Sequence, residues 1–123
     1  MLHLRIAAIA IAVAGASGCA SDNWTRADTR RELAYIAVST IDAVQTSQIR
    51  HSPYEEVDPL GRAVLGAKPS VADTAVYFVS LQMSHYLISR ALPPKWRKYW
   101  QYATITTGSA YVISNCNLGL LCE

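Results

Sequence analysis

A chain of 123 residues with a formal net charge of +2 has room for one small domain and lacks the charge excess that draws proteins to nucleic acid. Eleven Lys and Arg nearly balance nine Asp and Glu, and 51% of the residues are hydrophobic. We therefore expect one domain with a modest core and no nucleic-acid partner.

The chain begins with a segment typical of an export signal. A short basic start ending at Arg5 precedes roughly a dozen apolar or small residues, whereas a membrane-spanning helix needs about 20. This length is typical of the apolar region of a signal peptide. We predict that residues 1–18 form a cleaved signal peptide.

The end of this segment, Ala16-Ser17-Gly18-Cys19, resembles the lipobox of bacterial lipoproteins, with alanine where a leucine is usual. The resemblance implies that Cys19 becomes the first mature residue and is acylated by a diacylglyceryl group and a fatty acid such as palmitate. The protein would then have membrane lipid as a partner, through the acylated Cys19. Ala20 and Ser21 resemble the residues of lipoproteins sent to the outer membrane, facing the periplasm, rather than kept at the inner membrane. The alternatives are an ordinary secretory signal and an uncleaved anchor.

Charged residues gather in three segments, at 22–32, 50–68 and 90–98, and the stretches between them carry only Asp42 and Asp73. We interpret the charge-poor stretches as three helices. A lipidated tether, residues 19–27, would precede a domain of residues 28–123. The predicted fold is all-α, a small three-helix up-down-up bundle, which places the start of the first helix and of the third beside the end of the second.

The first helix is expected from about Asp28 to Ile49 and is predicted to be amphipathic. Helical spacing places one apolar face inward, formed by Leu33, Ile36, Ala37, Thr40, Ile41 and Val44. The opposite face would point to water and carries Tyr35, Ser39, Asp42 and Thr46.

A long loop with three prolines and room for one short turn follows, from His51 to Ser70. The body of the chain here resembles a group of small, mostly uncharacterised bacterial membrane proteins. Their Asp-x-x-Gln-Thr element, Glu-x-Asn-Pro loop, glycine and Pro-Ser match Asp42, Gln45 and Thr46, then Glu56, Asp58 and Pro59, then Gly66, Pro69 and Ser70. Asp58 replaces the asparagine, and extra residues precede Gly66. The resemblance implies no established activity.

The second helix is expected to begin at Ser70, an N-cap with Asp73 three residues later, and to end near Leu92 before two prolines. Its apolar residues point all round the axis. Such a helix lies either at the centre of a bundle or in lipid. The third helix is expected after Pro94 and ends near Asn117.

Basic and aromatic residues interleave at the start of the third helix. In the predicted bundle they lie at the same end as Trp24 and the lipid anchor. Aromatic rings settle at the headgroup level of a bilayer, and Lys and Arg favour an anionic surface. We predict a second membrane contact formed by Trp24, Arg90, Lys95, Trp96, Arg97, Lys98 and Trp100. The alternative is that the rings pack on the bundle and the charges are merely solvated.

Two cysteines stand six residues apart, Cys116 and Cys122, in a chain predicted to reach an oxidising compartment. In an uninterrupted helix they would be too far apart to bridge. A helix stop at Asn117 to Gly119 would let them meet. We predict a disulfide between them, the alternative being two free thiols.

The sequence supplies polar candidates but no catalytic mechanism. A possible polar site consists of Asp42, Gln45, Glu56, Asp58 and His85, although a lone histidine in an apolar helix is most often a packed residue. The histidines lack metal-ligand spacing, and neither a phosphate loop nor a nucleophile elbow occurs. We expect no catalytic residues, no metal and no cofactor.

The leading hypothesis is a small lipid-anchored protein of the cell envelope with a binding or structural role and an unidentified protein partner. The alternative is a polytopic membrane protein with three spanning helices. Its outer ends would hold most of the Lys and Arg, against the positive-inside rule. An envelope enzyme using His85 and the acidic loop is the third hypothesis.

Overall fold

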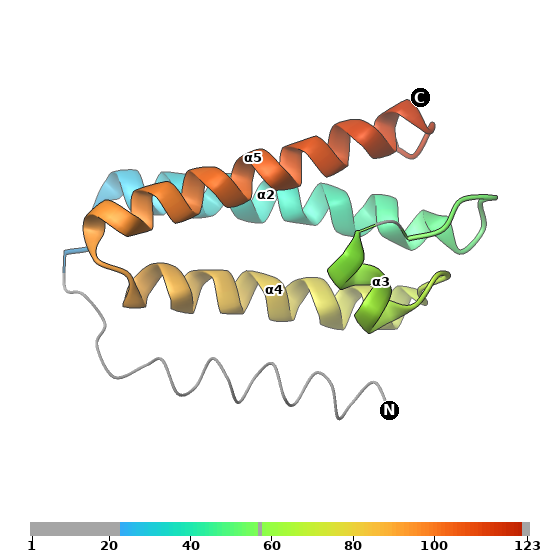
Figure 1. Ribbon diagram of the computed structural model, residues 1–123, viewed down its shortest axis with the longest axis horizontal. Helices are drawn as coiled ribbons and strands as arrows, with labels where there is room; N and C mark the ends of the chain where they lie inside the picture. The colour runs from blue at the N-terminus through green and yellow to red at the C-terminus, as the bar shows by residue number, and fades with distance from the viewer. Residues whose placement is uncertain (1–22, 57, 122–123) are drawn as a thin grey trace.

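The computed structural model describes residues 23–56 and 58–121, and all regular structure in these ranges is helical. Helix α2 spans Arg26–Ile49, α3 spans Pro59–Leu65, α4 spans Val71–Ala91 and α5 spans Pro94–Asn117 (Figure 1). The predicted all-α class is therefore confirmed. The predicted signal peptide, Cys19 and Cys122 lie outside the described residues.

Local capping chemistry fixes the helix ends. The Thr25 hydroxyl accepts a hydrogen bond from the Asp28 N–H at 3.1 Å, and the Asp28 carboxylate accepts one from the Thr25 N–H at 2.8 Å, a capping box that starts α2. Ser70 caps α4 through the Asp73 N–H at 3.1 Å, as predicted. The long helices begin and end within two residues of their predicted bounds.

The loop between α2 and α4 contains the short helix α3, in the place where the sequence allowed one turn. The Asp58 carboxylate accepts a hydrogen bond from the Gly61 N–H at 2.7 Å, and Pro59 takes the first helical position, where its missing N–H costs nothing. Gly66 ends the helix with a φ of +83°, a left-handed conformation that favours glycine. The domain thus has three long helices and a fourth short one.

The three long helices are not packed equally. Helix α2 packs most extensively against α5 and less against α4, whereas α4 and α5 touch far less. The starts of α2 and α5 and the end of α4 lie together at one end, and α3 lies at the other (Figure 1). The composition of α4 predicts a helix at the centre of a bundle or in lipid. In the structure the helix with the most extensive packing is α2 and not α4.

The interior of the bundle is polar. Among the described residues, only four hydrophobic side chains are buried: Ile49, Tyr77, Phe78 and Leu120. Twelve polar or charged side chains are buried: Asp28, Glu32, Ser39, Gln45, Thr46, Glu56, Thr74, His85, Ser89, Arg97, Gln101 and Asn115. Hydrogen bonds between helices, rather than apolar contacts alone, therefore define the centre of this protein.

The predicted orientation of the first helix is wrong. Leu33 is 59% exposed and Ile41 and Val44 are more than two-fifths exposed, while Ser39 and Thr46 from the opposite face are buried. The physical reason is that the polar residues of α2 find hydrogen-bond partners on α4 and α5. Apolar residues consequently cover much of the outside, including Val76, Val79 and Met83 of α4 and Ile113 of α5. Within the described residues, none of the helices combines the length and the apolar character needed to cross a membrane.

Candidate binding site between the helices

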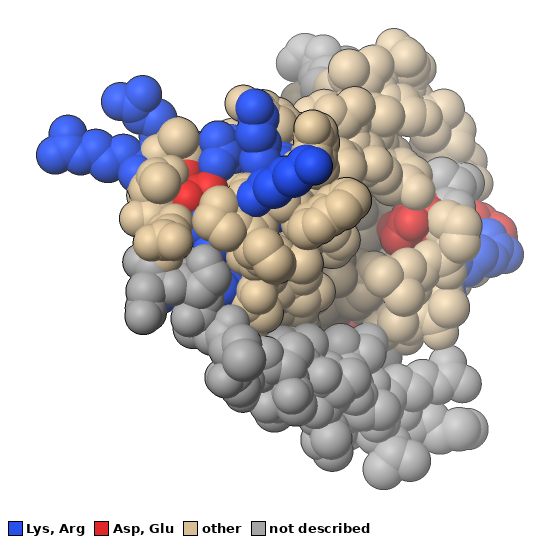
Figure 2. All heavy atoms as spheres, turned by 60° about the vertical axis from the view of Figure 1, so that its left-hand side comes forward, with Lys and Arg blue, Asp and Glu red and all other residues tan. Residues whose placement is uncertain are grey.

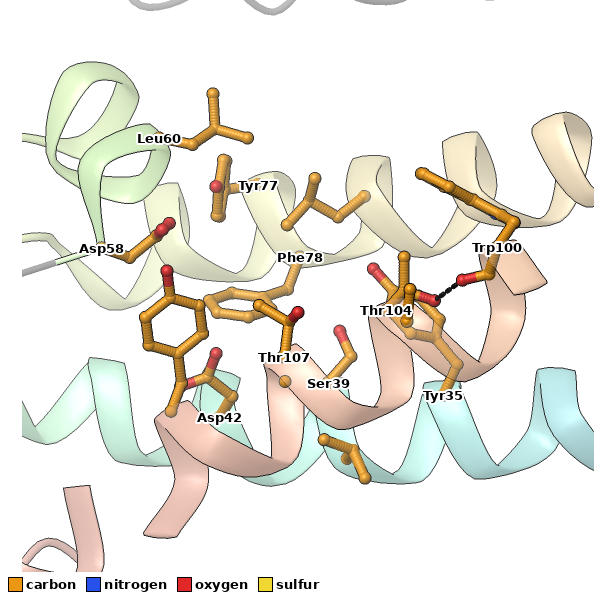
Figure 3. A pocket seen from close by; sticks show the side chains of 15 residues that line it. Tyr35, Ser39, Asp42, Asp58, Leu60, Tyr77, Phe78, Trp100, Thr104 and Thr107 are labelled. Atoms are coloured by element: carbon orange, nitrogen blue, oxygen red, sulfur yellow. Dashed lines mark hydrogen bonds between the residues drawn. The ribbon is translucent and has the colours of Figure 1, made fainter. Parts of the chain in front are cut away.

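A cavity of about 290 Å³ lies between α2, α4 and α5, with α3 at one end (Figure 3). It forms where α4 and α5 separate. Five of its fifteen lining residues are aromatic: Tyr35, Tyr77, Phe78, Trp100 and Tyr111. The remaining lining residues are Val38, Ser39, Asp42, Asp58, Leu60, Leu81, Ala103, Thr104, Thr107 and Gly108. Its walls are therefore mainly aromatic and aliphatic, with polar groups at defined places, as in small-molecule sites.

Two carboxylates mark one end of the cavity, which we call the acidic end. Asp42 comes from α2 and Asp58 from the N-cap of α3, and in Figure 3 both side chains lie at the α3 end of the lining residues. A second cavity of about 20 Å³, enough for about one water molecule, adjoins this end and is also lined by Glu56. A Cβ at Gly61 would lie 3.0 Å from the Asp58 carboxylate and 3.3 Å from Glu56, so glycine lets α3 approach these acids.

Electrostatics at the acidic end favour the neutral form of Asp42. Burial, followed by the negative charges of Glu56 and Asp58, raises the pKa of Asp42 to about 7, against a weaker opposing effect of the Asn115 hydrogen bond. That bond runs from Asn115 Nδ2 to Asp42 Oδ1 at 3.1 Å. Burial and the same carboxylates also raise the pKa of Tyr77 and Tyr111, and the Tyr111 hydroxyl interacts with Asp58. Among the described residues, neither Asp42 nor Asp58 forms an ion pair with Lys or Arg.

His85 lies behind the other end of the cavity. Its ring stacks on Tyr35 at a centroid distance of 3.6 Å and on Trp100 at 5.3 Å, and both of these rings line the cavity. His85 Nδ1 is 2.8 Å from Glu32 Oε1, and Nε2 is 2.8 Å from Thr104 Oγ1. The buried pair of His85 and Glu32 therefore fixes the orientation of one cavity wall.

The order carboxylate, imidazole, hydroxyl is that of a hydrolase triad, but its surroundings differ from those of one. Thr104 lies within α5, and its hydroxyl is also 2.9 Å from the Trp100 carbonyl and 3.0 Å from the Gln101 carbonyl. Backbone N–H groups inside a helix are used by the helix, so they do not form an oxyanion hole beside Thr104. The arrangement fits a structural role for His85 better than the role of a general base that activates Thr104.

Arg97 joins the ends of three helices. It is fully buried and donates hydrogen bonds to the Ser89 carbonyl at 2.7 Å, the Asn23 carbonyl at 2.9 Å and the Asp28 carboxylate at 3.1 Å. Burial raises the pKa of Asp28, but the hydrogen bonds that its carboxylate accepts from Thr25, Arg31 and Arg97 together outweigh burial and lower this pKa below 3.8. Arg97 was predicted as a membrane contact, and its buried position contradicts this role.

The other predicted membrane-contact residues divide into two groups. Trp24 is partly buried and its ring lies 5.1 Å from the guanidinium carbons of both Arg90 and Arg97, while Trp100 faces the cavity. Lys95, Trp96 and Lys98 are exposed, Trp96 to 60%. Figure 2 shows Lys and Arg side chains gathered at this end, which we call the basic end and define by Arg26, Arg30, Lys95 and Lys98.

The structure brings together most of the predicted polar site. Asp42, Glu56 and Asp58 meet at the acidic end, and Gln45 lies one helical turn from Asp42, where it donates a hydrogen bond to the Leu120 carbonyl at 3.1 Å. His85 does not join them and pairs with Glu32 instead. The aromatic residues of the cavity were missed, because nothing in their sequence spacing indicates that they share a wall. Asn115, which links Asp42 and Gln45, was missed for the same reason.

The cysteine prediction is tested only in part. Cys116 forms a disulfide, and its predicted partner Cys122 lies outside the described residues. The backbone turns back after α5 as expected, because Gly119 has a φ of +78° and the Leu120 N–H donates to the Asn115 carbonyl at 3.1 Å. The pairing with Cys122 stays a prediction.

Comparisons with protein families, curated proteins and solved structures found no match to this chain. Within the described residues, no group of three or more His, Cys, Asp or Glu side chains is arranged to hold a metal ion.

Proposed function

We propose that this protein is a small lipid-anchored protein of the bacterial cell envelope that binds a small molecule, without catalysis, in the cavity of a three-helix up-down-up bundle. The observation that carries the proposal is the cavity itself. Its volume of about 290 Å³ is at the lower end for ligand sites, which suits a molecule of one to three aromatic rings. The lipid anchor is Cys19, in the outer membrane facing the periplasm.

The chemistry of the walls supports binding over structural support alone. Tight packing is the rule in protein interiors, and a domain of this size gains nothing in stability from an unfilled space between its helices. Here aromatic rings from α2, α4 and α5 surround that space, and hydrogen bonds fix at least one of its walls through His85. Pre-formed apolar walls with a few oriented polar groups are the usual form of a ligand site.

The neutral fluorescent probe N-phenyl-1-naphthylamine tests for an accessible cavity. The soluble form starting at Ala20 should raise the fluorescence of this probe with saturable binding. Ala103 lines the cavity on α5, so Ala103→Phe should fill it and abolish saturable binding. Ala110→Phe is the matched control, an exposed alanine on the same helix that does not line the cavity. Equal probe binding by both variants would show that the probe binds the apolar exterior, and would overturn the proposal.

One observation favours the second candidate, an integral membrane protein with three spanning helices. Between the charged ends, the exposed side chains of α2, α4 and α5 are apolar or uncharged, while ionisable groups such as Glu32 and His85 are buried. Carbonate extraction of a Cys19→Ser variant, exported with a cleavable signal, separates the two candidates. Release into the soluble fraction supports the lipid-anchored protein, and retention in the membrane supports the spanning one.

A further inference from the structure

We propose that the ligand of this cavity is a small organic cation, an ammonium or quaternary ammonium group on an apolar body, with its charge between Asp42 and Asp58. This inference rests on the proposed function and names the class of ligand. It draws on three features of the cavity: the two carboxylates, the aromatic rings beside them and the shape of the remaining wall.

Within residues 23–56 and 58–121, the two carboxylates of the acidic end have no basic partner. Asp42 accepts a hydrogen bond from the Asn115 amide, and Asp58 accepts one from the Gly61 N–H and interacts with the Tyr111 hydroxyl. None of the ion pairs formed by described residues includes either carboxylate. Elsewhere in the same interior the pattern differs, because the buried Asp28 carboxylate is paired with both Arg97 and Arg31. The missing positive charge is therefore particular to the cavity.

Aromatic rings stand next to these carboxylates. Tyr77 and Phe78 of α4 and Tyr111 of α5 line the same part of the cavity as Asp42 and Asp58, as Figure 3 shows for the labelled residues. The faces of such rings attract ammonium groups, most strongly where water is excluded. A divalent metal ion would instead need several oxygen ligands or retained water. Carboxylates surrounded by rings thus select an organic cation over a metal ion.

The remaining wall suits the uncharged body of such a ligand. Val38, Leu60 and Leu81 supply aliphatic surface, and Trp100 closes the end far from the carboxylates. The cavity has room for a cation with one aromatic ring. Burial of that ring would supply the apolar part of the binding free energy, while the two carboxylates would orient the charged group.

The raised pKa of Asp42 supports this charge complementarity. Its causes are burial and the negative charges of Glu56 and Asp58, and a bound cation would oppose both. The groups that face Asp42 are Glu56 and Asp58, Tyr35 of its own helix, Tyr77 of α4, and Tyr111 and Asn115 of α5. The tyrosines have raised pKa values and stay neutral near pH 7. Cation binding should therefore release protons from carboxyl groups and become tighter as the pH rises from 5.5 to 8.

Isothermal titration calorimetry with benzyltrimethylammonium tests the inference, and benzyl alcohol serves as the uncharged ligand with the same ring. The soluble parent should bind the cation at least 10-fold more tightly than the alcohol at pH 8. Asp42→Asn and Asp58→Asn keep the shape of the side chains and the α3 cap, and each should lower cation affinity at least 10-fold. Glu55→Gln is the matched control, since it removes one exposed carboxylate of the same loop outside the cavity, and should change affinity less than twofold.

The outcomes separate this inference from the proposed function. If N-phenyl-1-naphthylamine binds in an Ala103→Phe-sensitive manner but the cation is not preferred over benzyl alcohol, the ligand class is wrong and the binding function stands. If Asp42→Asn and Asp58→Asn remain folded by circular dichroism and bind the cation as the parent does, the assigned position of the charge is wrong. If neither the neutral probe nor the cation binds, both proposals fail.

Discussion

Arg97 of α5 donates a hydrogen bond to the Asp28 carboxylate of α2 at 3.1 Å, and both side chains are buried. The same guanidinium reaches backbone carbonyls at the end of α4, at Ser89 and Leu92. One side chain thus holds together the start of α2, the end of α4 and the start of α5. A buried ion pair stabilises a particular geometry and is costly to break on one side only.

Replacing Arg97 should strongly destabilise the domain. Arg97→Met leaves the Asp28 carboxylate buried beside Arg31 alone, and we expect a loss of about 3–5 kcal/mol in the free energy of unfolding, measured by urea denaturation. Lys98→Met removes a neighbouring exposed charge and should change stability by less than about 0.5 kcal/mol. A small effect of Arg97→Met would mean that Arg97 does not join these helix ends in solution.

The raised pKa of Asp42 should be visible in the pH dependence of the free energy of unfolding. Its pKa of about 7 in the folded state exceeds its ordinary value of 3.8, so between these values the folded protein binds more protons than the unfolded chain. The free energy of unfolding contributed by this group therefore falls as the pH rises from about 4 to 7. Asp42→Asn should flatten this slope and be more stable than the parent at pH 8, by on the order of 2 kcal/mol once solvent screening is allowed for.

The ionisation of Asp28 should change the free energy of unfolding with pH in the opposite direction to that of Asp42. Hydrogen bonds lower its pKa below 3.8, so its stabilising contribution is present above that pH and is lost as the pH falls through the folded-state pKa. Asp28→Asn should therefore lose stability near neutral pH and converge with the parent in acid. Urea denaturation at pH 3, 5 and 8 separates the two aspartates. Parallel pH profiles for the parent and Asp42→Asn would show that the pKa of Asp42 is not raised in the folded protein.

The disulfide prediction can be tested directly by thiol labelling. The soluble form starting at Ala20 retains two of the three cysteines, Cys116 and Cys122. Without reductant, the denatured protein should react with no maleimide, and after reduction it should react with two. Peptide mapping of the unreduced protein should recover the two cysteines in one linked fragment. Labelling of both residues without reductant would rule the bridge out.

Helix ends in this chain are predictable because their signals are local, whereas the inward faces of the helices depend on packing between distant segments. The Ser70 cap, the prolines after α4 and the glycine after α5 act within a few residues, and they fixed the helix ends. The inward face of α2 was mispredicted because apolar periodicity assumes an apolar interior. Whether Glu32 or Leu33 points inward depends on partners more than 50 residues away, such as His85. The cavity is not predictable from the sequence for the same reason, because its walls come from distant segments. The resemblance to small bacterial membrane proteins nevertheless indicates Asp42, Glu56 and Asp58 as residues of interest.

The exposed basic end still predicts a second membrane contact, but with fewer residues than the sequence suggested. Lys95 and Lys98 are exposed beside Trp96, whereas Arg97 is buried. The soluble form should bind anionic vesicles weakly, and added salt should reduce the binding. Lys95→Gln with Lys98→Gln should weaken it by about 2 kcal/mol, because each charge near an anionic surface contributes about 1 kcal/mol.

Tryptophan fluorescence supplies an independent measure of this contact. Trp24 packs on Arg90 and Trp100 faces the cavity, so Trp96 is the tryptophan that membrane contact should affect most. Vesicles should shift the emission of the parent to the blue, and Trp96→Phe should remove most of the shift. Arg50→Gln, which removes an exposed charge at the end of α2 remote from the basic end, should bind as the parent does. If Arg50→Gln weakened vesicle binding as much as Lys95→Gln or Lys98→Gln alone, the binding would reflect only a general attraction between the basic protein and the anionic vesicles. The acylated Cys19 would then be the sole proposed anchor.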